Sequence, residues 1–174
     1  MASPDGQRIA VRPAVGAEDM AAVRALFREY QRWLDVEACF AGFEAELATL
    51  PGAYAPPHGG IWLAVAGPTV AGAVGLRPLD DRRGEMKRLW VRPACRGRGG
   101  GRRLALACIA GARAAGYREL CLETLERMAA ARALYAALGF RPALPFGEVV
   151  ADDICYMTLD LTSFSRSKTP QLQP

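Results

Sequence analysis

The stretch Gly84–Arg103, GEMKRLWVRPACRGRGGGRR, constrains the fold of this chain more than any other segment. Its run from Met86 to Val91 is typical of a strand, and Pro93 ends that strand. A glycine- and arginine-rich turn then leads directly into the helical run LALACIAGARAA. Such a turn presents amide N–H groups and the positive end of a helix dipole, which together favour an anionic ligand.

Positive charge is concentrated in the same stretch. Between Arg82 and Arg103 lie nine Lys or Arg residues against one acid, Glu85, so this window carries +8, whereas the whole chain carries +4. The remainder of the chain is therefore net acidic. Local basicity of this kind indicates a site for a polyanion and not a generally basic protein.

The bulk composition predicts one globular domain over 1–161, followed by a Ser-, Gln- and Pro-rich tail, 162–174, that we expect to be disordered. Five cysteines without a C-x-x-C pair are typical of reduced thiols, and with a single histidine they predict no metal site. Neither a signal peptide nor a membrane-spanning run is visible. We therefore expect a cytoplasmic protein without membrane contact.

Hydrophobic periodicity predicts an α/β protein of mixed (α+β) element order. Strands are expected at 9–14, 61–66, 70–76, 86–91, 117–124 and 154–161, an extended segment at 140–145, helices at 17–33, 40–50, 99–115 and 128–138, and a polar loop at 77–84. This order predicts a central mixed β-sheet of six to seven strands with helices on both faces. The sheet should be antiparallel in its first half and parallel around the turn after Val91.

The turn Arg96–Gly101, RGRGGG, matches the pattern R-x-x-G-x-G. Glycines let the backbone approach a ligand closely, and the neighbouring arginines add charge, so the turn suits a pyrophosphate; a flexible surface loop is the alternative. A Rossmann site needs G-x-G-x-x-G after the first strand, whereas this turn follows the fourth. A P-loop needs a Gly-Lys pair, which the chain lacks. Hydride transfer and nucleotide hydrolysis are therefore disfavoured.

The chain resembles the GNAT superfamily of acyl-CoA-dependent N-acetyltransferases. The matching segments are MKRLWVRP (Met86–Pro93), the turn and the helix after it, GYRELCLET (Gly116–Thr124) and ARALYAALGFRP (Ala131–Pro142). The expected element order agrees with that family over 9–161. The resemblance implies a GNAT-like fold, acetyl-CoA as co-substrate without a metal, and acetyl transfer to a primary amine of a small molecule or peptide.

By matched position the resemblance also implies a set of acyl-CoA-binding residues. The strand contributes main-chain groups and the turn contributes amides and charge; the residues are Leu89, Trp90, Val91, Arg96, Gly97, Arg98, Gly99, Gly100, Gly101, Arg102, Thr124 and Met128. Two positions depart from the family pattern. Met128 stands where many relatives have an asparagine, so that polar contact is expected either to be lost or to be supplied elsewhere, with Thr124 as the candidate. Gly100 stands where an apolar residue is more usual.

Two residues are implied to be catalytic. Tyr135 would donate a proton or hydrogen bond to the departing thiolate; on the residues alone it is a core tyrosine of an alanine-rich helix. Glu85 would be the general base, or else an acid that balances nearby cations. The fallback bases are Glu123, Asp152 and Asp153. A backbone N–H near Leu89 or Trp90 would stabilise the attacked carbonyl oxygen.

The acceptor site is expected between 33–40, 54–60 and 146–153. These segments carry acids that suit a cationic amine or are solvated loop charges: Asp35, Glu37, Glu148, Asp152 and Asp153. One rival hypothesis is a catalytically silent acyl-CoA sensor or scaffold, which Met128 favours. A second is a nucleic-acid-binding module, but the arginines are not interleaved with aromatics, so no nucleic-acid partner is expected. The identity of the amine and the formation of a homodimer stay open.

Overall fold

The computed structural model describes residues 8–147 and 152–163. In chain order the elements are β1 (Ala10–Pro13), α1 (Gly16–Leu34), η2 (Glu37–Phe40), α2 (Phe43–Ala48), η3 (Gly52–Tyr54), β2 (Gly60–Ala66), β3 (Thr69–Pro78), β4 (Arg83–Val91), η4 (Pro93–Cys95), α3 (Gly100–Ala114), β5 (Glu119–Leu125), α4 (Ala129–Ala137), β6 (Arg141–Pro142) and β7 (Ile154–Asp160). The tail from residue 164 onward and Glu148 lie outside the described residues.

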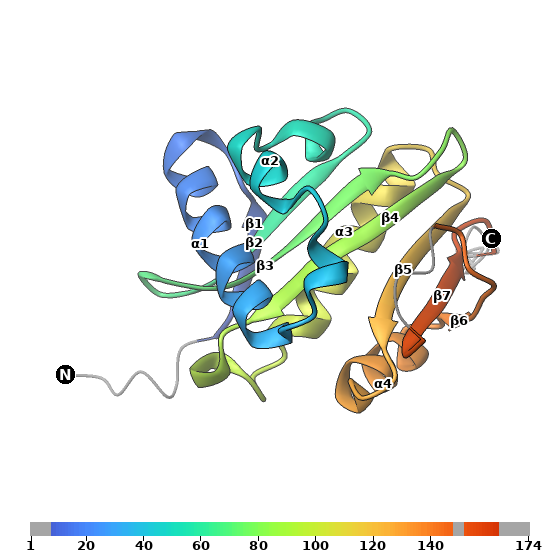
Figure 1. The fold of residues 1–174 in the computed structure, drawn as a ribbon. Coiled ribbons are helices and arrows are strands. Elements are labelled where there is room, and N and C mark those ends of the chain that lie inside the picture. Colours follow the sequence, from blue (N-terminus) through green and yellow to red (C-terminus); the bar gives the residue numbers. More distant parts are fainter. Residues whose placement is uncertain (1–7, 148–151, 164–174) are drawn as a thin grey trace, which may run out of the picture.

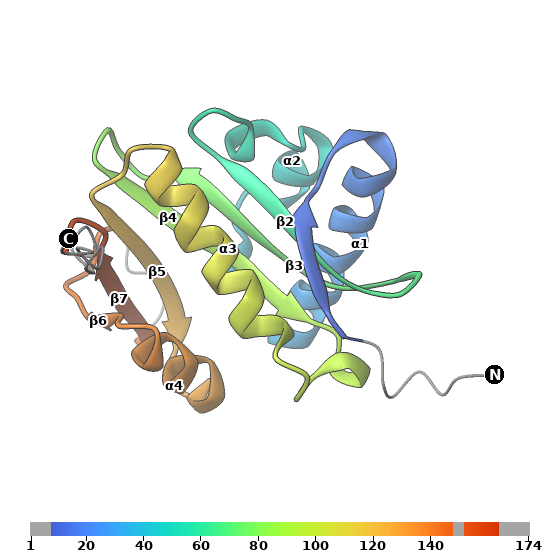
Figure 2. The ribbon, with the colours of Figure 1, turned by 180° about the vertical axis from the view of Figure 1, so that it is seen from behind.

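The described strands form one seven-stranded sheet in the order β1-β2-β3-β4-β5-β7-β6. β4 and β5 pair in parallel, and the other five pairs are antiparallel. Helices α1 and α2 lie against one face (Figure 1). Helix α3 crosses the other face, with α4 at the end of β5 (Figure 2). The predicted mixed sheet with helices on both faces is therefore confirmed.

Two hydrophobic layers hold the helices onto the sheet. Val23, Leu26 and Phe27 of α1, which repeat at helical spacing, are fully buried in the layer shared with α2. Leu104 and Cys108 of α3 are fully buried in the opposite layer. Periodic apolar residues therefore place α1 and α3 on opposite faces of β4. None of the helices in residues 8–147 and 152–163 has the length and apolar character needed to cross a membrane.

β4 and β5 pair over three residues each, Arg83–Glu85 with Glu119–Cys121. Beyond these residues the two strands separate toward Val91 and Leu125 (Figures 1 and 2). The predicted parallel pairing of the strands on either side of the turn after Val91 is therefore confirmed, and it is confined to the end of β4 far from that turn. Beyond the paired residues, β4 carries a β-bulge, which bends the strand out of a straight ladder.

That bulge lies at Arg88. Ala73 of β3 pairs with Trp90, but Gly75 pairs with Lys87, so β4 holds one extra residue, and Arg88 has a φ of 59°. The side chain of Arg88 packs among residues of η2 and α2, on the α1 side of the sheet. The bulge thus aims a cation at the end of the sheet where the strands part.

The predicted polar loop 77–84 is shorter than expected. β3 continues to Pro78 and β4 begins at Arg83, three residues before the predicted start at Met86. Arg77 and Glu85 lie directly opposite each other, and the Arg77 Nε donates to a Glu85 carboxylate oxygen at 2.8 Å. Cross-strand ion pairing lets these polar residues occupy strand positions.

The ring of Trp62 lies between two glycines, Gly60 of its own strand and Gly111 of α3. A Cβ atom built on Gly111 would lie 2.3 Å from Trp62 Cη2, and one on Gly60 would lie 2.6 Å from the same atom. The indole therefore cannot move away from α3 toward Gly60. Contact with Trp62 explains why a glycine occupies the middle of this helix.

We predict that Gly111→Ala lowers the free energy of unfolding by about 1–3 kcal/mol, because the new methyl group overpacks against Trp62. The matched control is Gly101→Ala in the same helix, where a Cβ would meet Leu134 Cδ2 at an ordinary 3.6 Å. Alanine has the higher helix propensity, so the control should be neutral or stabilising by up to about 1 kcal/mol. Urea unfolding of both variants measures the difference, and equal effects would contradict the packing argument.

Candidate active site

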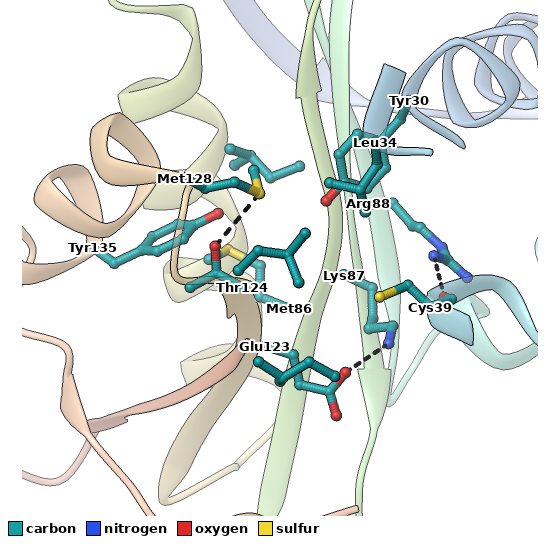
Figure 3. Close-up of a pocket in the computed structure, with 13 residues that line it drawn as sticks. Tyr30, Leu34, Cys39, Met86, Lys87, Arg88, Glu123, Thr124, Met128 and Tyr135 are labelled. Carbon is teal, nitrogen blue, oxygen red and sulfur yellow. Dashed lines mark hydrogen bonds and ion pairs between the residues drawn. The ribbon is translucent and has the colours of Figure 1, made fainter. Parts of the chain in front are cut away.

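A two-part pocket lies where β4 and β5 separate. The outer part has a volume of about 820 Å³ and lies between the end of α1, the end of β4, the glycine-rich turn and the start of α4. The inner part is narrow, about 50 Å³, and lies between β4 and β5 (Figure 3). Both parts are lined by four shared residues: Tyr30, Leu34, Leu89 and Met128. The two parts therefore adjoin each other.

The glycine-rich turn forms one wall of the outer part. Gly97 and Gly99 have φ angles of 75° and 77°, a conformation that glycine adopts without strain, and Gly99 is the N-cap of α3. The amides of Gly100, Gly101 and Arg102 lie in the first turn of α3, where the helix offers them no acceptor. The turn therefore presents N–H donors and the positive end of α3 to the pocket.

Packing explains why a glycine, Gly100, stands where an apolar residue is more usual. Gly100 is buried against Ile9, just before β1, and Val91 of β4, and a Cβ there would lie 3.1 Å from Ile9 Cδ1 and 3.7 Å from Val91 Cγ1. Ile9 thus fills the space that an apolar side chain at this position would occupy.

Arg96 is held at the edge of the outer part. Its Nε donates to the Val91 carbonyl at 3.0 Å, and its guanidinium lies 4.7 Å from the ring centre of Trp90 and 5.1 Å from that of Trp33. These contacts fix the side chain on two indoles beside the turn. Arg102 lines the pocket directly, whereas Arg98 is half-buried and does not line it.

The end of β4 forms the pocket floor. Leu89, Trp90 and Val91 line the outer part, and beyond Glu85 the edge of β4 that faces β5 has no strand partner. Its main-chain groups are therefore available to an extended ligand with amide groups. The Trp90 indole packs on α1, 5.1 Å from the ring centre of Trp33.

Tyr135 closes the inner part from α4. Its ring is 6% exposed and packs edge-on against Phe140 at 5.8 Å, and its hydroxyl faces the pocket (Figure 3). Burial raises the pKa of Tyr135 above its ordinary value. Thr124 and Met128 lie beside it, and the Thr124 hydroxyl donates to Met128 Sδ at 3.7 Å. The tyrosine hydroxyl is therefore a neutral donor at the inner end of the pocket.

The two candidate carboxylates occupy different places. Glu85 is 1% exposed, does not line the pocket, and is paired with Arg77 at 2.8 Å and Lys87 at 3.3 Å. Glu123 lines the inner part, where its carboxylate lies 3.7 Å from Lys87 Nζ (Figure 3). Lys87 thus lies between the two carboxylates, with Glu85 behind it and Glu123 toward the pocket.

Only some of the segments predicted to wall the acceptor site line the pocket. Trp33, Leu34 and Cys39 line it, but no described residue of 54–60 does. Within that segment Tyr54 is 1% exposed, and its hydroxyl donates to Glu46 at 2.9 Å. The acids of these segments also lie away from the lining. Asp35 caps α1, Asp152 lines a separate hollow, Asp153 is half-buried, and the side chain of Glu37 lies outside the described part.

Several lining residues were not predicted from the sequence. They are Tyr30, Lys87, Arg88, Arg127 and the first turns of α4. The Arg127 guanidinium donates to the Leu34 carbonyl at 2.6 Å and so connects α1 to the loop before α4. Trp33 is 47% exposed and lines the outer part. Helical spacing places Tyr30 on the apolar face of α1, but no local signal distinguishes pocket from core.

This fold and pocket define an acyltransferase that uses an acyl-CoA. The chain belongs to the acetyltransferase (GNAT) family, whose family model matches residues 20–140. An uncharacterised N-acetyltransferase of Schizosaccharomyces pombe is 31% identical over 148 residues, which are 83% of this chain and 90% of that protein. The protein is therefore an acetyl-CoA-dependent acyltransferase.

Solved structures have the same fold. An acetyltransferase from Streptococcus agalactiae has a TM-score of 0.71 at 19% identity and covers 88% of this chain and 99% of its own. A putative acetyltransferase from Salmonella typhimurium, solved with acetyl-CoA, has a TM-score of 0.66 at 22% identity and covers 92% of this chain and 98% of its own.

The residues of the pocket fit acetyl-CoA. The positive-φ glycines Gly97 and Gly99 and the free amides of α3 suit a pyrophosphate, and the open edge of β4 suits the amides of a pantetheine arm. In the described part of the chain no three His, Cys, Asp or Glu side chains come together as metal ligands would.

We predict that Gly99→Ala weakens acetyl-CoA binding by about tenfold. A Cβ at Gly99 has open space around it, so a steric clash does not cause the effect. Instead, holding alanine at positive φ costs about 1–2 kcal/mol, and this strain shifts the turn. The matched control is Gly116→Ala, which has the same strain with open space but follows α3 at its other end. Calorimetric titration with acetyl-CoA should show weakened binding in Gly99→Ala and unchanged binding in the control. Equal affinities in both variants would contradict the assignment.

Proposed function

We propose that this protein transfers the acetyl group of acetyl-CoA to a primary amine of a small molecule or peptide by direct attack. The observation that supports this most is that the two parts of the pocket adjoin, with the amide-rich turn at one end and Tyr135 and Glu123 at the other. Bound acetyl-CoA supplies a thioester whose carbonyl carbon accepts the amine. The chain has to hold that cofactor, remove a proton from the amine and stabilise the departing thiolate.

We assign the general base to Glu123 in preference to Glu85. An ammonium group has no lone pair, so a carboxylate must reach it and take its proton, directly or through a water molecule. Glu123 lines the pocket, whereas Glu85 is enclosed by Arg77 and Lys87. In this assignment Glu85 holds Lys87 in place and Lys87 orients Glu123.

Tyr135 is assigned to the leaving group. Because burial raises its pKa, the phenol stays protonated when a thiolate forms beside it. A thiol has an ordinary pKa of about 8.5, below that of a phenol at about 10, so full proton transfer from Tyr135 is uphill. The hydroxyl therefore acts by donating a hydrogen bond to the thiolate. The backbone N–H of Leu89, just after the bulge, is assigned to the carbonyl oxygen.

We predict that Tyr135→Phe lowers kcat by about tenfold to a hundredfold and leaves the Kd of acetyl-CoA within about twofold, because the variant loses one donor to the thiolate. The wild type should show no alkaline loss of kcat below about pH 10 from this residue, since its pKa is raised. A thiol-release assay over a panel of amines measures kcat, and calorimetry measures binding. A Phe variant with normal turnover would remove Tyr135 from the mechanism.

We predict that Glu123→Gln lowers kcat by about a hundredfold or more at neutral pH, because the amide cannot take a proton. Glu85→Gln is the matched comparison. It should lower the melting temperature, because Arg77 and Lys87 lose a buried partner, and it should reduce kcat by a smaller factor. If Glu85→Gln lowers kcat more than Glu123→Gln does, Glu85 is the general base and the assignment to Glu123 is wrong.

The same assay tests the function itself. Thiol release that depends on an added amine supports the proposed transfer. Saturable acetyl-CoA binding without turnover on any amine would support an acyl-CoA-binding sensor. Salt-dependent binding of DNA in place of acetyl-CoA would support the nucleic-acid hypothesis.

A further inference from the structure

One buried hydroxyl in the structure lacks a partner. Within residues 8–147 and 152–163, Tyr156 Oη is the buried side-chain polar atom that makes no hydrogen bond, and the residue is 6% exposed. Leaving a hydroxyl buried without a partner costs about 1–3 kcal/mol, so native proteins seldom keep one without a use. The free protein therefore holds a donor that a ligand could satisfy.

Tyr156 lies beside the proposed base. It is directly paired with Glu123 across β5 and β7, and side chains of directly paired residues point to the same face of a sheet. Phe146 packs edge-on against the Tyr156 ring at 5.1 Å, and a Cβ built on the next residue, Gly147, would lie 3.5 Å from Glu123 Oε1. The same short segment thus covers both side chains.

Electrostatics agree with this placement. The pKa of Tyr156 is raised, first by burial and then by the nearby Glu123, and Cys39 lies close enough to contribute. Both of those residues line the inner part of the pocket. Tyr156 itself lines the neighbouring hollow with Asp152, and Ile154 lines both that hollow and the inner part of the pocket.

The polar groups at this end form a specific pattern. Glu123 is an acceptor and is assigned to the amine, whereas Lys87 Nζ, 3.7 Å away, can only donate. Tyr156 adds a second donor from the neighbouring strand. An amine alone would satisfy Glu123 and leave the Tyr156 hydroxyl unpaired. An amine with an oxygen acceptor close to its nitrogen satisfies both.

We propose that the acceptor is an α-amino carbonyl compound, whose amine binds at Glu123 and whose carbonyl oxygen accepts a hydrogen bond from Tyr156. A free amino acid and the N-terminus of a peptide share this chemistry. The inference rests on the proposed function, because it assumes that an amine is acetylated beside Glu123. It adds a substrate class and a recognition residue that the mechanism itself does not require.

The test uses matched sets of three acceptors built on the side chains of alanine, leucine, methionine and phenylalanine. Each set holds the amino acid, its amide as a mimic of a peptide N-terminus, and the decarboxylated amine. The amines of the three compounds differ in pKa, that of the amide being near 8 and that of an alkylamine near 10.4, so kcat/KM is referred to the concentration of free base of each. Thiol release from acetyl-CoA is measured for the wild type, Tyr156→Phe and Tyr117→Phe.

In at least one set, the wild type should favour a carbonyl-bearing member over the decarboxylated amine by about tenfold or more, the usual effect of one hydrogen bond to a buried donor. In Tyr156→Phe that ratio should fall by about tenfold. Activity on amino acids against activity on amides identifies which source of the α-amino carbonyl unit is used. Tyr117→Phe is the matched control, because its hydroxyl bonds the His58 carbonyl at 2.7 Å in the α3 layer, away from the pocket.

Two results would overturn the inference and leave the proposed function standing. One is a wild type that uses plain amines as well as their carbonyl-bearing partners, and the other is a ratio that Tyr156→Phe does not change. Absence of turnover on every compound would overturn both the proposed function and this inference.

A second readout needs no acceptor. If the Tyr156 hydroxyl is unpaired in the free protein, Tyr156→Phe should keep or raise the melting temperature, by roughly two to four degrees. Tyr117→Phe, which loses a made hydrogen bond, should lower it. A lower melting temperature for Tyr156→Phe would show a structural hydrogen bond and overturn the recognition role.

Discussion

The rest of the structure depends on the shortness of the parallel ladder between β4 and β5. Three residues of each strand form the parallel ladder, and beyond Glu85 and Cys121 the strands separate. Main-chain groups at a strand edge need partners, and here the open edges face a pocket in place of another strand. The ladder holds the two halves of the sheet together. Because it ends after three residues, β4 and β5 leave space for the pocket between them.

A chain of charges crosses the sheet at this point. Arg77 of β3, Glu85 and Lys87 of β4 and Glu123 of β5 are linked by contacts of 2.8, 3.3 and 3.7 Å. Two cations and two carboxylates balance, so a buried charge is not left uncompensated. The bulge at Arg88 turns a further cation toward Glu46, at 2.8 Å. Glu123, at the end of this chain of charges, is the carboxylate among the described residues that lines the pocket.

The sequence predicted the elements and the turn that opens α3 well, because their signals are local. The helix expected at 17–33 is Gly16–Leu34, and the turn Arg96–Gly101 opens α3 as expected. The surroundings of Glu85 were not predictable, since its burial depends on Arg77, eight residues away on another strand. The same holds for Arg96, whose cation–π partner Trp33 comes from α1.

The sequence by itself determined the order of elements, the two apolar faces of the sheet and the glycine-rich turn, because periodicity and glycine content act over a few neighbouring residues. Tertiary structure alone decided where the parallel ladder ends and which carboxylate faces the pocket. It also set Tyr156 beside Glu123, residues 33 positions apart that meet through strand register. Register and strand divergence arise from pairing between distant segments, and a single sequence does not encode that pairing locally.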